Sequence, residues 1–360
     1  EYPFLIGASG ISVLPITSLA QRPKVSADRM STGVPRLDAM LGNGGFYRGS
    51  AILVSGTAGT GKSTIAAQLC DTTCANGERA MYFSFEESEA EIVRNMASVG
   101  IHLGRWVEAG LLRFRCVRPG LLGLEAHLFD MQAAVTEFEP ALVVEDPVSD
   151  LLRAGSGVDV NAMLTRQVDF LKARGITALF TSLNADGEPS RGDEQLASLV
   201  DAWVLVKTMQ GNGEHNRILY ILKARGMAHS NQLREFLLTD AGIELADVYV
   251  GADGVLTGSA RQAQEARELA ESVARADDLD QRRANLGRRR DAVKAQTVAL
   301  WREFDDEAEI VERLLSHGSS GVDDRADQRA EQGRLRQADA DTGVDVPRVP
   351  THASALAGTA

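Results

Sequence analysis

Short apolar runs and amphipathic stretches take turns along roughly the first 200 residues of the chain. The apolar runs are typical of buried strands, and the stretches between them repeat apolar residues at three- and four-residue steps, as helices do. Beyond that point the apolar runs follow one another through short turns. This order predicts an α/β fold with a mostly parallel central sheet that is extended by antiparallel hairpins. The expected strands are residues 51–54, 81–85, 112–116, 141–146, 178–182, 202–207, 217–223 and 235–238.

A different pattern begins at Gly258 and predicts one long helix. Residues 260–315 contain no proline and a single glycine, and apolar residues recur there at every seventh position. That spacing is typical of a coiled-coil seam. A second register of the repeat is incomplete, so a single solvated helix held by ion pairs is the alternative. The seam consists of Leu279, Leu286, Val293 and Leu300, and the second register of Arg283, Arg290, Thr297, Phe304 and Val311.

The two ends of the chain differ from the part between them. Residues 317–360 offer few side chains to bury, so we expect this tail to be disordered. The segment from Glu1 to Ile11 resembles residues 235–243, because both predict a short strand, a turn with glycine and another strand. We interpret residues 1–28 as the closing hairpin of a missing upstream domain, followed by a linker.

Composition narrows the classes of function. The formal net charge of -12 argues against a general binder of nucleic acid or of anionic membranes. No apolar stretch approaches the roughly 18 residues of a spanning helix, and we expect no signal peptide. Cys70 and Cys74 lie four residues apart with no second ligand pair, which favours buried thiols over a zinc site and suits a reducing cytoplasm.

The motif that carries most information follows the first expected strand. Residues 56–63 match G-x-x-x-x-G-K-[ST] and lead into a helical pattern, a context that disfavours an ordinary glycine turn. In such a loop, backbone amides point at phosphate oxygens, Lys62 reaches the β- and γ-phosphates, and the Ser63 hydroxyl lies on Mg²⁺. We therefore expect ATP and Mg²⁺ as ligands. The expected nucleotide-binding residues are Gly56, Thr57, Ala58, Gly59, Thr60, Gly61, Lys62, Ser63 and Thr64.

Acidic residues follow two of the expected strands, at the edge where open α/β sheets bind their ligands. Asp146 ends the strand 141–146, and we expect its carboxylate on the metal side, acting through Ser63 or water. A solvated turn residue before Pro147 is the alternative interpretation.

Glu86 and Glu87 follow the strand 81–85. Adjacent carboxylates repel each other, which raises one pKa and favours a general base. We expect Glu86 to be that base and to lie beside the metal, with Glu87 supporting it. The same residues also suit an acidic first helical turn capped by Ser88, and the two roles are compatible.

Positive charge at the transferring phosphoryl group is a further requirement of catalysis. Lys223 and Arg225 precede Gly226 at the end of an expected strand. They are candidates for cationic fingers that enter the site of a neighbouring subunit. A pair of exposed cations at the end of a strand is the alternative.

Taken together, these motifs resemble the second ATPase domain of the KaiC family, the circadian-clock relatives of RecA and RadA. The resemblance covers about two thirds of the chain and implies a RecA-like ATPase domain, which we assign to residues 29–250. The heptad pattern separately predicts a helical coiled-coil segment at residues 258–316. The matching pieces are Ser31–Gly33, Leu37-Asp38, Met40–Gly42, residues 56–63, Phe85–Ser88, Val144–Asp146, Asp169–Gly175, Lys223–Gly226, His229 and Arg234–Phe236.

The resemblance implies a hexameric ring with ATP between subunits, slow ATPase activity, autophosphorylation and signalling to clock-type or other protein partners. It implies Glu86 and Glu87 as catalytic carboxylates, with Lys223 and Arg225 acting in trans. Clock proteins of the family accept phosphate on adjacent Ser and Thr residues. In the matching stretch here only Ser198 carries a hydroxyl, so Ser198 is the expected acceptor; a serine on a helix surface is the alternative.

Two other functions compete with this one. A RecA- or RadA-like ATPase acting on DNA would share the fold, but residues 184–195 carry four acids against one arginine and no aromatic residue, which does not suit a phosphate backbone. An ATP-stabilised oligomeric scaffold without kinase activity is the third possibility. The long helical extension departs from the clock proteins, and we interpret it as a helix for self-association or for a partner helix.

Overall fold

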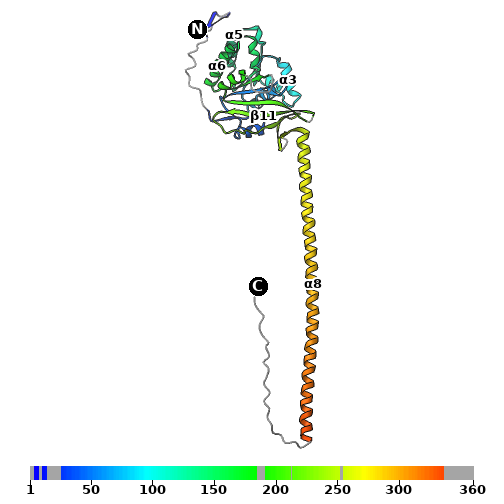
Figure 1. Ribbon diagram of the computed structural model, residues 1–360. Helices are drawn as coiled ribbons and strands as arrows, with labels where there is room; N and C mark the ends of the chain where they lie inside the picture. Colours follow the sequence, from blue (N-terminus) through cyan, green and yellow to red (C-terminus); the bar gives the residue numbers. More distant parts are fainter. Residues whose placement is uncertain are drawn as a thin grey trace. The chain divides into compact units, whose positions relative to one another are not determined.

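The computed structural model describes residues 4–7, 10–13, 26–184, 191–211, 213–251 and 254–335 (Figure 1). The chain divides into two compact units, residues 1–268 and residues 269–360, and each is described by itself. The first unit contains the sheet and all the sites expected from the sequence.

A nine-stranded sheet organises the first unit, in the order β13-β12-β11-β10-β5-β9-β8-β6-β7. Neighbouring strands from β10 to β7 run parallel, whereas β10 to β13 pair antiparallel through successive hairpins. The predicted parallel sheet with an antiparallel extension is confirmed. The strands are β5 (Ala51–Gly56), β6 (Ala80–Ser84), β7 (Leu112–Cys116), β8 (Leu142–Asp146), β9 (Thr177–Leu183), β10 (Ala202–Gly211), β11 (Glu214–Ala224), β12 (Arg234–Thr239) and β13 (Gly242–Asp247).

Within the described residues, three two-stranded antiparallel sheets lie outside this sheet. They are β1 (Phe4–Gly7) with β2 (Gly10–Val13), β3 (Arg29–Met30) with β4 (Phe46–Tyr47), and β14 (Tyr249–Gly251) with β15 (Gly254–Leu256). In the first, β1 and β2 pair antiparallel, as expected from their likeness to residues 235–243. Its origin in an upstream domain stays a prediction.

Helices cover both faces of the parallel strands, so each face has its own apolar core. Ile52 and Val54 of β5 face the core formed with α1, α2 and α3, which also buries Cys70 and Cys74 as predicted. Leu53 faces the core formed with α5, α6 and α7. The helices are α1 (Pro35–Met40), α2 (Lys62–Ala75), α3 (Glu89–Ala97), α4 (Gly104–Glu108), η2 (Pro119–Leu121), α5 (Leu124–Phe138), η3 (Val148–Arg153), α6 (Gly157–Ala173) and α7 (Arg191–Leu199).

The alternation of side chains along β8 sends its two acids to opposite faces. Asp146 follows Val144 on the α2 side, and Glu145 follows Val143 on the α6 side. There Glu145 Oε1 accepts a hydrogen bond of 3.0 Å from Gln167 Nε2, and both side chains are fully buried. Burial raises the pKa of Glu145 from 4.5 to about 8, so this carboxyl is neutral at physiological pH.

The helix α8 (Gly258–Leu335) contains 78 residues. The helical segment predicted from sequence ends at residue 316, and that boundary is wrong, because residues 317–335 are also helical. The good helix formers Ala, Arg, Gln and Glu in residues 325–335 account for the difference. The disorder expected for residues 336–360 falls outside the described residues.

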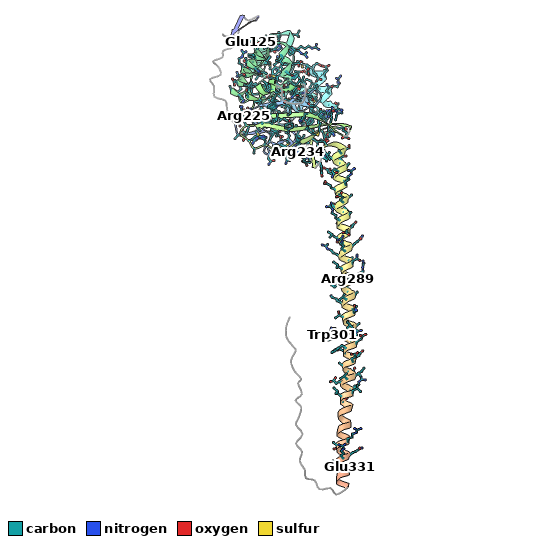
Figure 2. All side chains as sticks on the ribbon, in the orientation of Figure 1. Glu125, Arg225, Arg234, Arg289, Trp301 and Glu331 are labelled. Atoms are coloured by element: carbon teal, nitrogen blue, oxygen red, sulfur yellow. The ribbon has the colours of Figure 1, made fainter. Side chains whose placement is uncertain are left out.

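Side chains project all around α8, as Figure 2 shows at Arg289 and Trp301. The four seam residues are between 55% and 67% exposed. Ion pairs between residues four positions apart, such as Arg282 with Asp278 and Arg313 with Glu309, run along the same helix. A single helix with both features fits either a coiled coil or a solvated helix, so the coiled coil stays a prediction.

We predict that Glu145→Gln stabilises the nucleotide-free protein at pH 8 and has little effect near pH 4.5. The folded state keeps the Glu145 proton between about pH 4.5 and 8, whereas the unfolded chain releases it. Wild-type stability therefore falls with rising pH in this window, by up to about 1.4 kcal/mol per unit. Thermal midpoints measured across the window test this, with Glu108→Gln on the surface as control. Equal pH dependence in all three proteins would contradict a neutral Glu145.

Candidate nucleotide-binding site

The phosphate-loop sequence forms a tight turn between β5 and α2. β5 ends at Gly56, and α2 begins at Lys62 after Gly61, which has a φ of 99°. A Cβ atom at Gly61 would lie 2.6 Å from Cε1 of Phe236 on β12. Backbone conformation and packing thus both require glycine at this position.

Lys62 is held over the loop by the loop's own carbonyl groups. Its Nζ donates hydrogen bonds of 2.9 Å to Gly56 O and 2.7 Å to Thr57 O. The Thr60 hydroxyl donates to Thr57 O at 2.8 Å, which closes the turn. Burial lowers the pKa of Lys62, and the nearby carboxylates of Asp146 and Glu86 counteract that effect. The ammonium group therefore lies at the loop, in electrostatic contact with the acidic side of the site.

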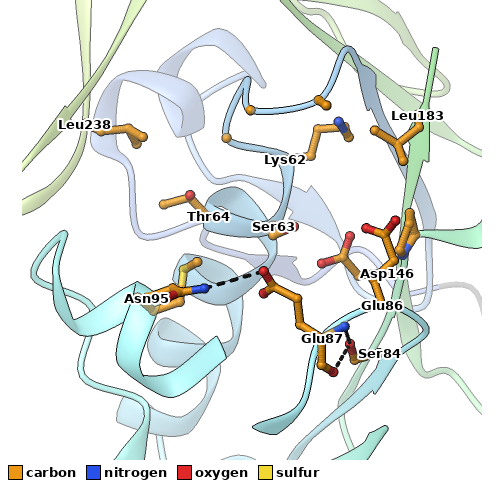
Figure 3. A pocket seen from close by; sticks show the side chains of 15 residues that line it. Lys62, Ser63, Thr64, Ser84, Glu86, Glu87, Asn95, Asp146, Leu183 and Leu238 are labelled. Atoms are coloured by element: carbon orange, nitrogen blue, oxygen red, sulfur yellow. Dashed lines mark hydrogen bonds between the residues drawn. The ribbon is translucent and has the colours of Figure 1, made fainter. Parts of the chain in front are cut away.

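A cavity of about 360 Å³ opens beside the loop at the carboxyl ends of the strands (Figure 3). It brings together the loop, the start of α2, the acids that follow β6 and the acid that ends β8, all predicted from sequence as one site. Its lining residues are Ala58, Gly59, Gly61, Lys62, Ser63, Thr64, Ser84, Glu86, Glu87, Asn95, Met96, Asp146, Pro147, Leu183 and Leu238.

Asp146 is buried, so it is not a solvated turn residue. Together with the Ser63 hydroxyl and Glu86 it offers oxygen ligands, the donors that Mg²⁺ prefers. Among the described residues, no group of three His, Cys, Asp or Glu side chains could hold a metal ion by itself. This donor set fits an ion that takes its other ligands from phosphates and water.

Glu86 and Glu87 lie at the cavity wall and are both exposed. Burial raises the pKa of Glu86, and the negative charges of Asp150 and Asp146 add to the rise. The backbone of Glu87 is held by the Ser84 hydroxyl, which donates to Glu87 O at 2.6 Å. Its side chain accepts a hydrogen bond of 3.4 Å at Oε1 from Asn95 Nδ2. Ser88 caps α3 in a capping box with Glu91, so the helix-start interpretation also holds.

Lys223, Arg225 and Ser198 do not line this cavity. Lys223 Nζ donates to Ala197 O and, at 2.8 Å, to Val200 O, and Arg225 Nη2 donates to Ser198 O at 3.0 Å. The two cations thus satisfy carbonyl groups at the C-terminus of α7 and hold the exposed Ser198 beside them.

Lys223, Arg225 and Ser198 lie at the other end of the strands from the phosphate loop. Ala224 pairs with Ala202, and Ala202 pairs with Ile52 near the start of β5, whereas the phosphate loop follows the end of β5. A strand of that length spans roughly 20 Å. Within one chain the cations therefore cannot reach a phosphate bound at the loop.

Several residues around the cavity could not be assigned to the site from the sequence. Tyr82 and Thr181 contact Asp146, Phe236 packs on Gly61, and Arg217 Nε donates to Gly59 O at 3.2 Å. The pattern placed all four in strands, but only the order of strands in the sheet brings them to the site. Residues 185–190 of the loop that we weighed as a DNA contact lie outside the described residues.

Comparison with known proteins bears directly on this site. The family model described as the KaiC ATPase matches residues 30–248. The chain belongs to the KaiC family. Its phosphate loop, the acids at the ends of β6 and β8 and the cations at the end of β11 all lie within the matched residues. A mostly parallel sheet with this connectivity is thus the RecA-like fold of a KaiC ATPase domain.

Three relatives show the extent of the similarity. Circadian clock protein KaiC2 of Synechocystis sp. is 44% identical over 88% of this chain and 56% of its own length. Circadian clock oscillator protein KaiC is 33% identical in Synechococcus elongatus, over 72% of this chain and 50% of its own, and in Thermosynechococcus vestitus, over 78% and 54%. The chain thus spans about half the length of the curated relatives it matches. The match with KaiC2 leaves out fewer residues of this chain than α8 contains, so it includes part of α8.

Proposed function

We propose that this chain is an ATP-binding subunit of a KaiC-type ring that hydrolyses ATP slowly with Mg²⁺ and transfers its γ-phosphate to water or to Ser198. The observation that carries the proposal is the cavity that joins the phosphate loop to three carboxylates. Family membership supports the ATPase activity. A role in a clock or another signalling system rests on the names of the relatives.

Each residue has a distinct part in the proposed reaction. The loop amides and Lys62 bind the β- and γ-phosphates, and Ser63 with Asp146 would hold Mg²⁺. The metal, when bound, offsets negative charge on the phosphates. Glu86 accepts the proton of the attacking water or serine hydroxyl while the new O–P bond forms and the bond between the γ-phosphorus and the bridging oxygen breaks, leaving ADP. Its raised pKa suits a base.

The distance between the phosphate loop and the pair Lys223 and Arg225 supports a ring arrangement. Lys223 and Arg225 lie at the edge opposite the loop, so they can serve only the nucleotide of another copy. Ser198 lies beside them and would approach the same phosphate. A head-to-tail ring brings these two edges together at every interface.

Mixed rings test the action in trans. Lys62→Ala removes phosphate binding, Arg225→Ala removes a cation, and each variant alone is expected to lose most ATPase activity. Coassembled in equal amounts, they should recover about a quarter of wild-type turnover, since that share of interfaces joins an intact loop to an intact Arg225. Arg174→Ala serves as a surface control with full activity. Failure to recover, in rings shown by mass to contain both variants, would contradict action in trans.

Phosphopeptide mapping tests the kinase activity. After incubation with Mg·ATP, the wild-type chain should gain one phosphate at Ser198, and Ser198→Ala should gain none while still producing ADP. Intact mass and released ADP are measured together. ADP release without any protein phosphate would leave an ATP-driven ring without autokinase activity. Tight nucleotide binding without turnover would favour the ATP-stabilised scaffold.

The exposed seam of α8 supports a second role, self-association through a coiled coil. The exposed apolar residues of the seam suit a protein partner. No helix among the described residues is long and apolar enough to span a membrane. A second copy of α8 offers a matching seam. A cytoplasmic location and the absence of nucleic-acid binding stay predictions from composition.

Charged residues in the seam are expected to break this association. Leu286→Asp with Val293→Asp should lower the particle mass measured by light scattering after gel filtration, because two buried carboxylates would oppose each other. Ala284→Asp with Ala295→Asp adds the same charge away from the seam and should leave the mass unchanged. An unchanged mass in both double variants would favour a solvated helix.

A further inference from the structure

The carboxylate of Asp146 is held on both of its oxygen atoms. The Tyr82 hydroxyl donates to Oδ2 at 2.5 Å, and the Thr181 hydroxyl donates to Oδ1. Both donors are fully buried, and Asp146 itself is only 8% exposed. Buried hydroxyls need a partner, and here both take the same side chain.

The sheet places one donor on each side of the carboxylate. β8 lies between β6 and β9, and all three strands run parallel. Tyr82, Val144 and Leu179 share the face toward α2, so the alternation of side chains puts Thr181 and Asp146 on that face as well. The same face carries Ser63 at the start of α2.

The donors themselves are fixed by packing. The Tyr82 ring lies against Phe114 with centroids 5.2 Å apart, and both rings belong to the apolar core. Thr181 is β-branched and sits in the middle of a buried strand, where its side chain has few rotamers. Two rigid donors leave Asp146 one orientation, with a free lone pair of each oxygen directed away from the donors.

We propose that Tyr82 and Thr181 are positioning residues that fix the Asp146 carboxylate for the metal of the nucleotide complex. This inference rests on the proposed function, since it assumes that a divalent ion binds beside the phosphate loop. A carboxylate locked in one rotamer suits a small octahedral ion and disfavours the larger and more variable coordination of Ca²⁺. The hydroxyl pair would therefore contribute both affinity for Mg²⁺ and discrimination against Ca²⁺.

The test uses Mn²⁺ as a paramagnetic probe of an octahedral site that also suits Mg²⁺. Free Mn²⁺ is titrated by electron paramagnetic resonance into the full chain with saturating ADP, and Mg²⁺ or Ca²⁺ is then added as competitor. Tyr82→Phe and Thr181→Val keep the bulk of each side chain and remove its hydroxyl. We expect each to raise the Kd for Mn²⁺ by roughly 10- to 100-fold, the range for partners of metal ligands, and to narrow the preference for Mg²⁺ over Ca²⁺.

Two controls separate positioning from general damage to the fold. Thr177→Val removes another buried hydroxyl of β9, which accepts a 3.0 Å hydrogen bond from the Gly49 amide, and should leave the metal constants unchanged. Thr181→Ser keeps the donor and should bind Mn²⁺ more tightly than Thr181→Val. Binding of ADP in EDTA should stay within about twofold of wild type in every variant, because neither hydroxyl contacts the phosphate loop.

The outcomes distinguish this inference from the function on which it rests. If the wild-type chain shows no ADP-dependent binding of Mn²⁺, the proposed nucleotide site itself is overturned. If wild type binds Mn²⁺ but Tyr82→Phe and Thr181→Val bind it with wild-type Kd and wild-type preference for Mg²⁺, the positioning role alone is overturned. A variant that loses Mn²⁺ affinity and retains ADP binding in EDTA supports it.

Discussion

The pairing of β5 with parallel neighbours on both sides is the constraint on which the rest of the structure depends. β9 and β10 both run in the direction of β5, and apolar side chains cover the sheet above and below it. A strand buried in this way has no polar environment except at its ends. The phosphate loop, the acids and the cavity therefore all lie where the parallel strands terminate.

The same burial decides what each acid of β8 can do. Glu145 faces the core under α6, where it is fully buried beside Gln167 and its raised pKa keeps it neutral. Asp146 faces α2, at the cavity, and both of its oxygen atoms accept hydrogen bonds from buried hydroxyls. Two adjacent acidic residues thus have different surroundings, because they lie on opposite faces of the sheet.

The two ends of the parallel strands carry groups of different charge, acids at one end and cations at the other. The phosphate-loop sequence and the acids line a cavity at one end of the parallel strands, and the opposite end presents Lys223 and Arg225 beside Ser198. Those cations also satisfy the last carbonyl groups of α7, which gives them a structural task within the single chain. A structural and a reactive role are compatible, because Arg225 is exposed while it makes this contact.

Local patterns in the chain predict the class of fold, the phosphate-loop motif, the acids at the strand ends and the long helix. Each of these depends on the spacing of residues along a single segment. The end of α8 was placed too early because glycines near residue 320 interrupt a stretch that otherwise favours helix. Tyr82 and Thr181 could not be found in this way. They are 64 and 35 residues from Asp146, and they meet it only because β8 lies between β6 and β9. Strand order and register are set by how whole segments pack, so the partners of Asp146 and the separation of Arg225 from the loop came from the tertiary structure alone.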